Sequence, residues 1–204
     1  MAKVKLTKKE ADRLMKIKGN SSGSLLSSYY SYVLKKSGES GIRLVEERMK
    51  ELGYPANLKN LSEASSFRWY PTSLSIFIIL IILEILDWDE SKAFDLGYDA
   101  PLHSIIPKLL IKFISLERGI KEVPNYWQKL FDFGNLQCTK INIKDKYLIL
   151  RLFGFKKFHL TSYFLMMGYL TKIFEIATRS KNVEVKQLKC LFWNDPYDEF
   201  KITW

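Results

Sequence analysis

Few side chains in this sequence are of the types that most often do chemistry. The 204 residues include two histidines, His103 and His159, and two cysteines, Cys138 and Cys190. A cysteine beside a histidine can act as a nucleophile with its base, but both cysteines fall on expected buried strands, away from the positive surroundings that activate a thiolate. The sequence has no His-Glu-x-x-His, kinase or dinucleotide-binding motif. We therefore expect a protein that is not an enzyme.

Two groups of acidic residues are the other candidates for catalytic or metal-binding chemistry. They are Asp87, Asp89 and Glu90, and Asp195, Asp198 and Glu199. The first group opens a helix, where negative charge is favourable, and the second belongs to an Asn-Asp-Pro turn. These structural roles explain both groups, so we expect no bound metal and no cofactor.

Aromatic residues are more numerous than a minimal core needs, with 13 Phe, 11 Tyr and 5 Trp. Tyr and Trp combine an apolar body with a polar tip, which suits a pocket for a small molecule. The candidate ligand-binding residues flank two expected helices and are Trp69, Tyr70, Tyr163, Met167 and Tyr169. The alternative, that these side chains only fill the core, stays open.

The chain is strongly basic, with 32 Lys and Arg against 22 Asp and Glu and a formal net charge of +10. Seven of the first 18 residues are basic, and Gly-Asn-Ser-Ser-Gly-Ser follows at 19–24. We treat residues 1–20 as a basic segment, helical or partly ordered, and residues 21–204 as a single domain. A solvated lysine-rich surface explains the charge, and only weak, non-specific nucleic-acid binding by the first 18 residues stays open.

Apolar residues at three- and four-residue spacing predict a helical first part of the chain. Helices are expected at 3–18, 25–36, 40–52, 73–86, 89–97, 104–117 and 123–133. The most apolar stretch, 74–86, is interrupted by Ser75 and Glu84. As a helix it would span about 20 Å, less than the roughly 30 Å of a bilayer core. We expect it to be a central buried helix, with no transmembrane segment in the chain.

Period-two alternation then replaces the helical spacing. It predicts a hairpin of strands at 136–143 and 147–153, a long helix at 158–179, and a closing hairpin that joins 183–192 to a last strand with Phe200, Ile202 and Trp204 facing inward. The predicted fold class is α+β: N-terminal helices, then a β-hairpin, a long helix and a β-hairpin. The two hairpins form a four-stranded antiparallel sheet packed against helices.

This order of elements resembles one superfamily. It contains 4-vinyl reductase-like sensor domains, haem nitric-oxide-binding-like domains and the small TRAPP vesicle-tethering subunits. The residues that carry the resemblance are RWYP at 68–71, WDESKAFDLGYDAP at 88–101, PNYWQKLFDFG at 124–134 and the closing hairpin after Cys190. Together they cover about residues 20–204. The resemblance implies a module that binds a ligand or a protein more often than it implies an enzyme.

The metal and haem sites of that superfamily are incomplete in this sequence. In some vinyl reductase-like sensors the last hairpin supplies two zinc-binding cysteines; here Cys190 matches the first, but Asp198 stands at the second. The Tyr-x-Ser-x-Arg signature of the haem branch is absent, and only His103 or His159 could serve as an axial ligand. We expect the protein to purify without stoichiometric zinc or haem.

We expect a stand-alone sensor-like domain that binds a small hydrophobic or aromatic ligand between helices and sheet. Its signal would pass through a homodimer or to a partner protein. Two cysteines without a paired spacing or a signal peptide suit reduced thiols and a cytoplasmic location. One alternative is a TRAPP-like adaptor for protein interaction, whose internal cavity would hold an acyl chain. The other is a basic protein that associates with nucleic acid.

Overall fold

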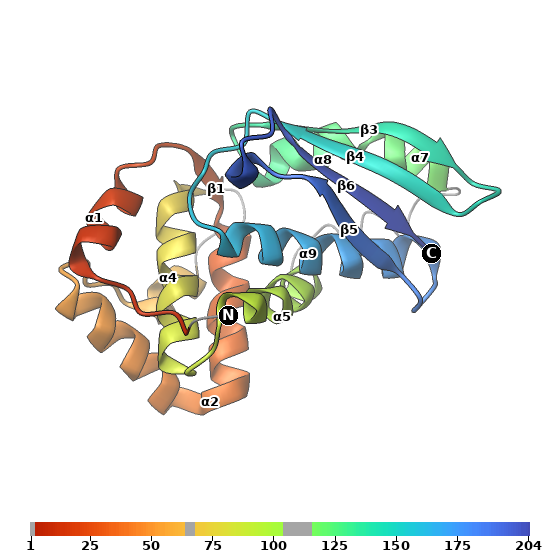
Figure 1. Cartoon of the computed structure of the whole chain (residues 1–204). Coiled ribbons are helices and arrows are strands. Elements are labelled where there is room, and N and C mark those ends of the chain that lie inside the picture. Colours follow the sequence, from red (N-terminus) through yellow and green to blue (C-terminus); the bar gives the residue numbers. More distant parts are fainter. Residues whose placement is uncertain (1–2, 64–67, 104–115) are drawn as a thin grey trace.

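The computed structural model describes residues 3–63, 68–103 and 116–204. The chain forms two parts, which we call the helical half (residues 3–103) and the sheet half (residues 116–204) (Figure 1). The helical half contains α1 (Lys8–Met15), β1 (Asn20–Ser22), α2 (Gly23–Glu51), α3 (Leu58–Ser62), β2 (Trp69–Pro71), α4 (Thr72–Ile85), η1 (Glu90–Lys92), α5 (Ala93–Asp99) and η2 (Ala100–His103).

The sheet half contains a four-stranded antiparallel sheet and the helices that cover one of its faces. Its elements are α7 (Leu116–Lys121), α8 (Val123–Leu130), β3 (Asn135–Asn142), β4 (Tyr147–Phe153), α9 (Thr161–Thr178), β5 (Glu184–Lys189), η3 (Leu191–Trp193) and β6 (Asp198–Thr203). The strand order is β3-β4-β6-β5, so the C-terminal strand lies inside the sheet. The predicted α+β fold, with two hairpins forming one antiparallel sheet, is confirmed.

The core of the helical half is built around α4. Every residue from Ile76 to Leu83 is buried, because α2, α1 and the β1–β2 pair cover the helix on different sides. Its last acidic residue, Glu84, accepts hydrogen bonds from the Leu6 amide and from Arg48. The expected central buried helix is therefore present, and no helix among the described residues is long and apolar enough to cross a membrane.

The core of the sheet half lies between the inner face of the sheet and α7, α8 and α9. Strands β4 and β6 point Leu148, Leu150, Phe200 and Ile202 into it, and each of these side chains is at most 1% exposed. The inward positions expected at 200 and 202 are thus confirmed. Trp204 is half-buried at the edge of the same cluster.

Two glycines bring α5 and α9 into direct backbone contact. A Cβ atom on Gly97 would lie 2.0 Å from the Leu165 carbonyl oxygen, and one on Gly168 would lie 2.1 Å from the Phe94 carbonyl oxygen. Real Cβ atoms do not approach so closely, so both positions need glycine at this helix spacing. This contact ties the helical half to the long helix of the sheet half.

The structure confirms one pair of expected helices and shortens another helix, and one expected helix falls mostly outside the described residues. The helices predicted at 25–36 and 40–52 are both present within the segment labelled α2, because non-helical backbone at Gly38, with φ of +62°, separates them. Helix α8 ends at Leu130, because Phe131 turns to extended backbone and pairs with Ser21. Most of the helix predicted at 104–117 lies outside the described residues.

Candidate functional site

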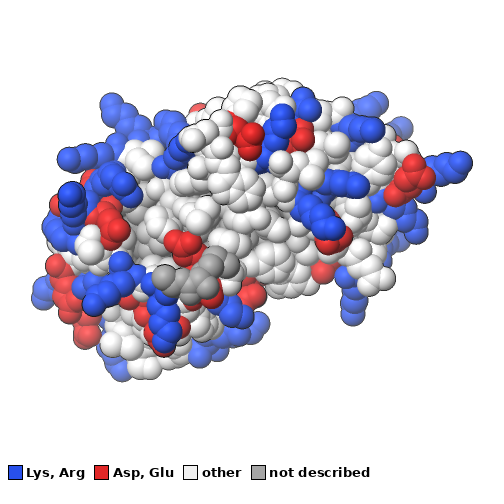
Figure 2. All heavy atoms as spheres, in the orientation of Figure 1, with Lys and Arg blue, Asp and Glu red and all other residues white. Residues whose placement is uncertain are grey.

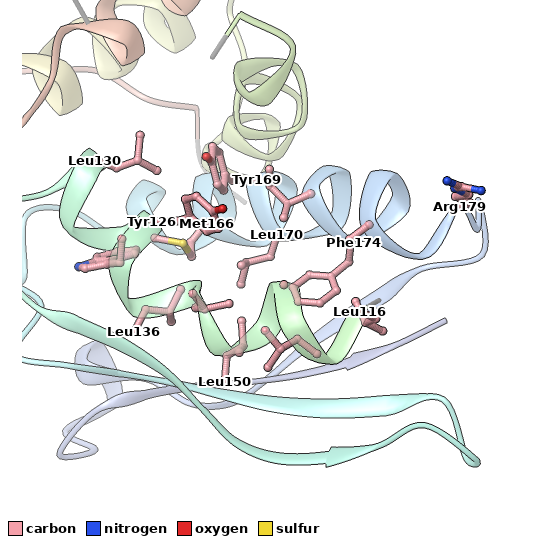
Figure 3. Close-up of a pocket in the computed structure, with 16 residues that line it drawn as sticks. Leu116, Tyr126, Leu130, Leu136, Leu150, Met166, Tyr169, Leu170, Phe174 and Arg179 are labelled. Carbon is pink, nitrogen blue, oxygen red and sulfur yellow. The ribbon is translucent and has the colours of Figure 1, made fainter. Parts of the chain in front are cut away.

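A cavity of about 240 Å³ lies in the sheet half, between α7, α8, α9 and the inner face of the sheet (Figure 3). Helix α9 supplies the largest share of its wall through residues at three- and four-residue spacing. These are Met166, Tyr169, Leu170, Ile173, Phe174 and Ala177. Such spacing puts them on one stripe of the helix, which faces the sheet.

The opposite walls come from the sheet and from α8. Leu136 and Leu150 project from β3 and β4, and Tyr126, Trp127 and Leu130 project from α8 (Figure 3). Helix α8 carries its apolar residues on one side, and Pro124 lies in its first turn, where a missing amide proton costs least. The cavity therefore arises where two amphipathic helices cross a sheet without closing completely on it.

The cavity is mainly apolar, with a few polar groups at its boundary. The Trp127 indole nitrogen donates a hydrogen bond to the Phe133 carbonyl oxygen at 2.9 Å, which leaves the ring as an apolar wall. Burial raises the pKa of Tyr126 above its ordinary value, so its hydroxyl stays protonated at neutral pH. Arg179 lies at the far end of α9 and is exposed (Figure 3).

This lining suits binding better than catalysis. No histidine or cysteine is among the described residues that line the cavity. An apolar protein cavity of about 150 Å³ is large enough to bind benzene, so a cavity of about 240 Å³ can hold a one- or two-ring molecule or a short aliphatic chain. Burial of such a molecule is driven by removal of apolar surface from water.

The five residues proposed from the sequence occupy different places. Tyr169 lines the cavity, whereas Tyr163 lines a smaller space of about 20 Å³ near Asp198. Met167 packs at the border of the sheet-half cluster, outside the described lining.

The other two candidates lie on β2, in the helical half. Trp69 is 46% exposed, and Tyr70 packs against the helical core. Helix α9 packs mainly against α5, and across the cavity it faces α8, whereas its contact with α4 is small. The candidates from the sequence did not include three residues that line the cavity, Trp127, Leu170 and Phe174. The apolar stripe of α9 was the signal that could have indicated Leu170 and Phe174.

The thiols are not set up as nucleophiles or as zinc ligands. Burial raises the pKa of both Cys138 and Cys190, which keeps them protonated. Asp198 accepts hydrogen bonds from the Leu191 amide and the Gln187 side chain, and its pKa is also raised by burial. Among the described residues, no group of three or more His, Cys, Asp or Glu side chains could hold a metal ion.

His159 belongs to a separate, charged cavity of about 340 Å³ between the N-terminal segment, α1 and the start of α9. Its Nδ1 accepts a hydrogen bond from the Thr161 amide at 3.3 Å, and its Nε2 lies 3.8 Å from a Glu90 oxygen. Burial lowers the pKa of this histidine below its ordinary value. The side chain of His103 lies outside the part of the chain that the structure describes.

The sequence contains one motif typical of a serine nucleophile. Residues 19–23, Gly-Asn-Ser-Ser-Gly, fit the Gly-x-Ser-x-Gly pattern, and β1 leads there into α2 as a nucleophile elbow requires. Ser21 is fully buried, however, and its hydroxyl lies 3.4 Å from the hydroxyl of Ser75. A buried serine that faces a second serine lacks the base and the access that a nucleophile needs.

Comparison with solved structures identifies the fold. No protein-family model matches the sequence, and no curated protein matches it. The structure is similar to an H-NOX protein from S. oneidensis in the Fe(II)NO ligation state, with a TM-score of 0.62, 13% identity, and coverage of 89% of this chain and 97% of that one. It is also similar to an Fe(II) unliganded H-NOX protein from K. algicida, with a TM-score of 0.59, 12% identity, and coverage of 89% and 95%.

An oxygen-binding H-NOX domain related to soluble guanylate cyclases matches with a TM-score of 0.59, 9% identity, and coverage of 89% and 92%. This chain has an H-NOX-like fold. The likeness supports the haem-NO-binding-like part of the resemblance seen in the sequence. At these identities it concerns the fold alone.

The described residues do not fit a haem. A haem needs an axial ligand and a large apolar slot in the same place, but the apolar cavity has no described histidine or cysteine in its wall. His159 lines the other cavity, which is bordered by charged side chains, among them Glu10, Arg13 and Glu90. Among the described residues, neither cavity combines the two requirements, and the apolar one, at about 240 Å³, is smaller than the roughly 300–1,000 Å³ of ordinary cofactor and drug sites.

Proposed function

We propose that this protein is a sensor-type domain that binds a small hydrophobic or aromatic ligand in the cavity between α8, α9 and the sheet. The observation that carries the proposal is the cavity itself, which is lined mainly by apolar side chains from α7, α8, α9, β3 and β4. Small ligands usually bind in apolar pockets with a few polar groups at the boundary, and the volume of about 240 Å³ suits a ligand smaller than an ordinary cofactor.

The solved structures with a similar fold support a ligand-binding role. One of them is described in its Fe(II)NO ligation state and another as an oxygen complex. Those proteins bind their gas ligands in a fold that this chain shares. In this chain the described lining favours an organic molecule held by burial of apolar surface over one held by a metal bond.

The packing around α9 suggests how binding is transmitted. A ligand in the cavity touches Met166, Leu170 and Phe174 on one side of α9. On another side the same helix meets α5 with backbone contact at Gly97 and Gly168. A shift of α9 would therefore move α5, because the backbones of the two helices are in direct contact at these glycines. The moved surface would be read by a second copy of the chain or by a partner protein.

A thermal-shift screen tests this function. The probes are indole, naphthalene derivatives and aliphatic alcohols of increasing length, each added to the purified full chain. A ligand that binds only the folded state stabilises it by about 2.7 kcal/mol at a hundredfold excess over its Kd, so we expect a clear rise in Tm for at least one probe.

Two tryptophan variants locate the site. Leu170→Trp extends a side chain that lines the cavity, and Met167→Trp is a matched change outside the described lining. We expect the ligand-induced rise in Tm to disappear in Leu170→Trp and to persist in Met167→Trp. If no probe shifts the wild-type Tm, the sensor function should be dropped in favour of the protein-interaction adaptor.

A further inference from the structure

The outer face of the β3-β4-β6-β5 sheet takes no part in the proposed ligand cavity, which lies against the inner face. The helices of the sheet half cover the inner face, where Leu148, Leu150 and Ile202 are buried. On β4 the residues that alternate with these leucines remain at least partly exposed; they are Tyr147, Ile149, Arg151 and Phe153. This face is therefore an uncovered surface made of four well-paired strands.

The strand register places like charges side by side on this face. Lys201 of β6 lies directly opposite Lys186 of β5, and Ile149 separates Lys201 from Lys140 of β3. Like charges directly opposite one another across two strands destabilise a sheet. A row of three lysines, Lys140, Lys201 and Lys186, thus crosses the sheet. Repulsion between their charges destabilises the folded state, and a bound anion would reduce that repulsion.

The carboxylates on this face are already engaged. Glu199 is buried and paired with Arg151, and Glu184 lies 3.1 Å from Lys186. Among the described residues, Lys140, Lys189 and Lys201 have no carboxylate within the 4.0 Å of an ion pair. The face therefore carries an excess of positive charge that the protein does not neutralise itself. On the face that Figure 2 presents, basic side chains are numerous and acidic ones lie between them.

Aromatic rings lie among these cations. The ammonium groups of Lys140 and Lys201 are 5.3 and 5.2 Å from the centre of the Tyr147 ring. The Tyr197 ring has Arg151 and Lys189 at 4.9 and 4.8 Å. Phe153 lies 5.1 Å from Tyr197 and is 36% exposed. Cationic groups and flat rings thus alternate over the surface.

We propose that the outer face of the β3-β4-β6-β5 sheet binds single-stranded nucleic acid without sequence preference. The lysines would contact phosphates, and unstacked bases would stack on Tyr147 and on the Tyr197–Phe153 pair. Stacking on an aromatic side chain tolerates any base, and binding of backbone phosphates by cations releases counterions. A four-stranded antiparallel sheet that presents aromatic rings is a surface on which single-stranded RNA is known to bind in other proteins.

The rings are what favour a nucleic acid over an acidic protein. An acidic peptide would satisfy the lysine row, but it offers no flat π-surface to Tyr147 or Tyr197. The basic residues of the N-terminal segment make a poorer site, because Lys3 pairs with Asp87 and Lys8 with Asp12. The sheet face is distinct from the cavity, so this proposal does not depend on the proposed ligand.

Fluorescence anisotropy with the full chain and a fluorescein-labelled oligouridylate tests the proposal. A probe of about 12 nucleotides suits the site sizes of single-strand-binding surfaces, roughly 4–16 nucleotides. Each phosphate contact with a single strand contributes about −0.7 to the slope of log K against log salt. The three lysines without a carboxylate partner predict a slope of about −2, which means about a twentyfold loss of affinity between roughly 50 and 200 mM salt.

Variants separate the charge from the rings. Lys140→Ala combined with Lys201→Ala should reduce the slope to about −0.7. Tyr147→Leu should weaken binding about tenfold, whereas Tyr147→Phe should preserve it. The matched charge control is Lys9→Ala with Lys16→Ala on and beside α1, which should change affinity less than twofold. Circular dichroism melting confirms that each variant is folded.

Three results would overturn the proposal. The first is failure of the wild-type chain to bind the probe at the lowest salt. The second is an equal loss of affinity in the Lys9/Lys16 control and in the Lys140/Lys201 variant. The third is competition by polyglutamate, at the same charge concentration, that matches competition by unlabelled oligouridylate; this result would assign the face to an acidic protein partner instead.

Discussion

The apolar residues of the helical half pack solidly around one helix, whereas those of the sheet half surround a cavity. In the helical half, α4 is surrounded by other elements, and its residues from Ile76 to Leu83 are almost completely buried. In the sheet half, α8 and α9 cross the inner face of a sheet and leave a cavity of about 240 Å³. A helix enclosed by helices packs solidly, whereas helices over a twisted sheet can leave space. The second arrangement is the one suited to a ligand.

The largest expected effect comes from removing the strand on which the sheet half depends. Deletion of residues 200–204 removes Phe200 and Ile202, whose burial contributes roughly 1.5–3 kcal/mol each against a total stability of about 5–15 kcal/mol. It also removes the strand that joins β4 to β5. We expect an insoluble or molten product. As a control, Thr203→Ala on the outer face should be folded, and an unchanged Tm in the truncated chain would refute the central role of β6.

The contact between the halves should be nearly as sensitive. Gly168→Ala places a Cβ atom 2.1 Å from the Phe94 carbonyl oxygen and should destabilise the fold by about 3 kcal/mol or more. The matched change is Gly154→Ala, where φ is +65° but the nearest atom beyond its chain neighbours is 3.8 Å away. Its cost should be only the left-handed backbone strain, about 1–2 kcal/mol. Chemical denaturation measures both, and the reverse order would show that α5 and α9 are less closely packed.

A pair of tryptophan substitutions compares the two cores directly. Ile79→Trp in α4 inserts volume where no space exists and should cost about 1–3 kcal/mol or more. Leu170→Trp directs its added volume into the cavity and should cost less than about 1 kcal/mol. Both parent residues are at most 3% exposed, so solvent exposure does not explain a difference. Equal losses of stability would mean that the sheet half is packed as solidly as the helical half.

The smallest effect concerns pH and the charged cavity beside α1. Burial lowers the pKa of His159 below 6.5, although Glu90 and Glu10 raise it and Arg13 lowers it further. The folded state therefore binds fewer protons than the unfolded state, and stability is complete above pH 6.5 and falls as the pH decreases through the folded pKa. Protonation of Nδ1 also ends the hydrogen bond from the Thr161 amide.

Urea denaturation between about pH 7 and 5 measures this effect. The wild-type free energy of unfolding should decrease more over this range than that of His159→Gln, which cannot protonate there. A steeper decrease in the variant would show that Glu90 and Glu10 dominate the environment of His159.

The sequence predicted the fold well, because its signals were local and repeated. Period-two alternation gave the strand pairs, and the apolar run before Leu86 gave the buried helix. Two separate runs of helical spacing, at 25–36 and 40–52, also predicted the break in α2, which lies at Gly38 with φ of +62°.

The site was harder to predict, because it depends on which helices meet. Tyr169, a candidate on the long helix, lines the cavity, and its role in ligand binding stays a prediction. The identity of the facing elements depends on the close approach of Gly97 and Gly168, which brings α5 against α9 and leaves α4 farther away. A single glycine in each helix does not reveal its partner in the sequence, so the sequence did not show that Trp69 and Tyr70 lie away from this cavity.

Native mass spectrometry tests the central claim, that the sheet-half cavity holds a small hydrophobic molecule, most directly. The wild-type chain and Leu170→Trp are each incubated with the probes of the thermal screen and weighed under native and denaturing conditions. We predict a mass increase of one probe molecule per wild-type chain that is lost on denaturation and absent from Leu170→Trp. A wild-type chain that retains its unliganded mass with every probe, or a variant that binds as well as the wild type, would contradict the account.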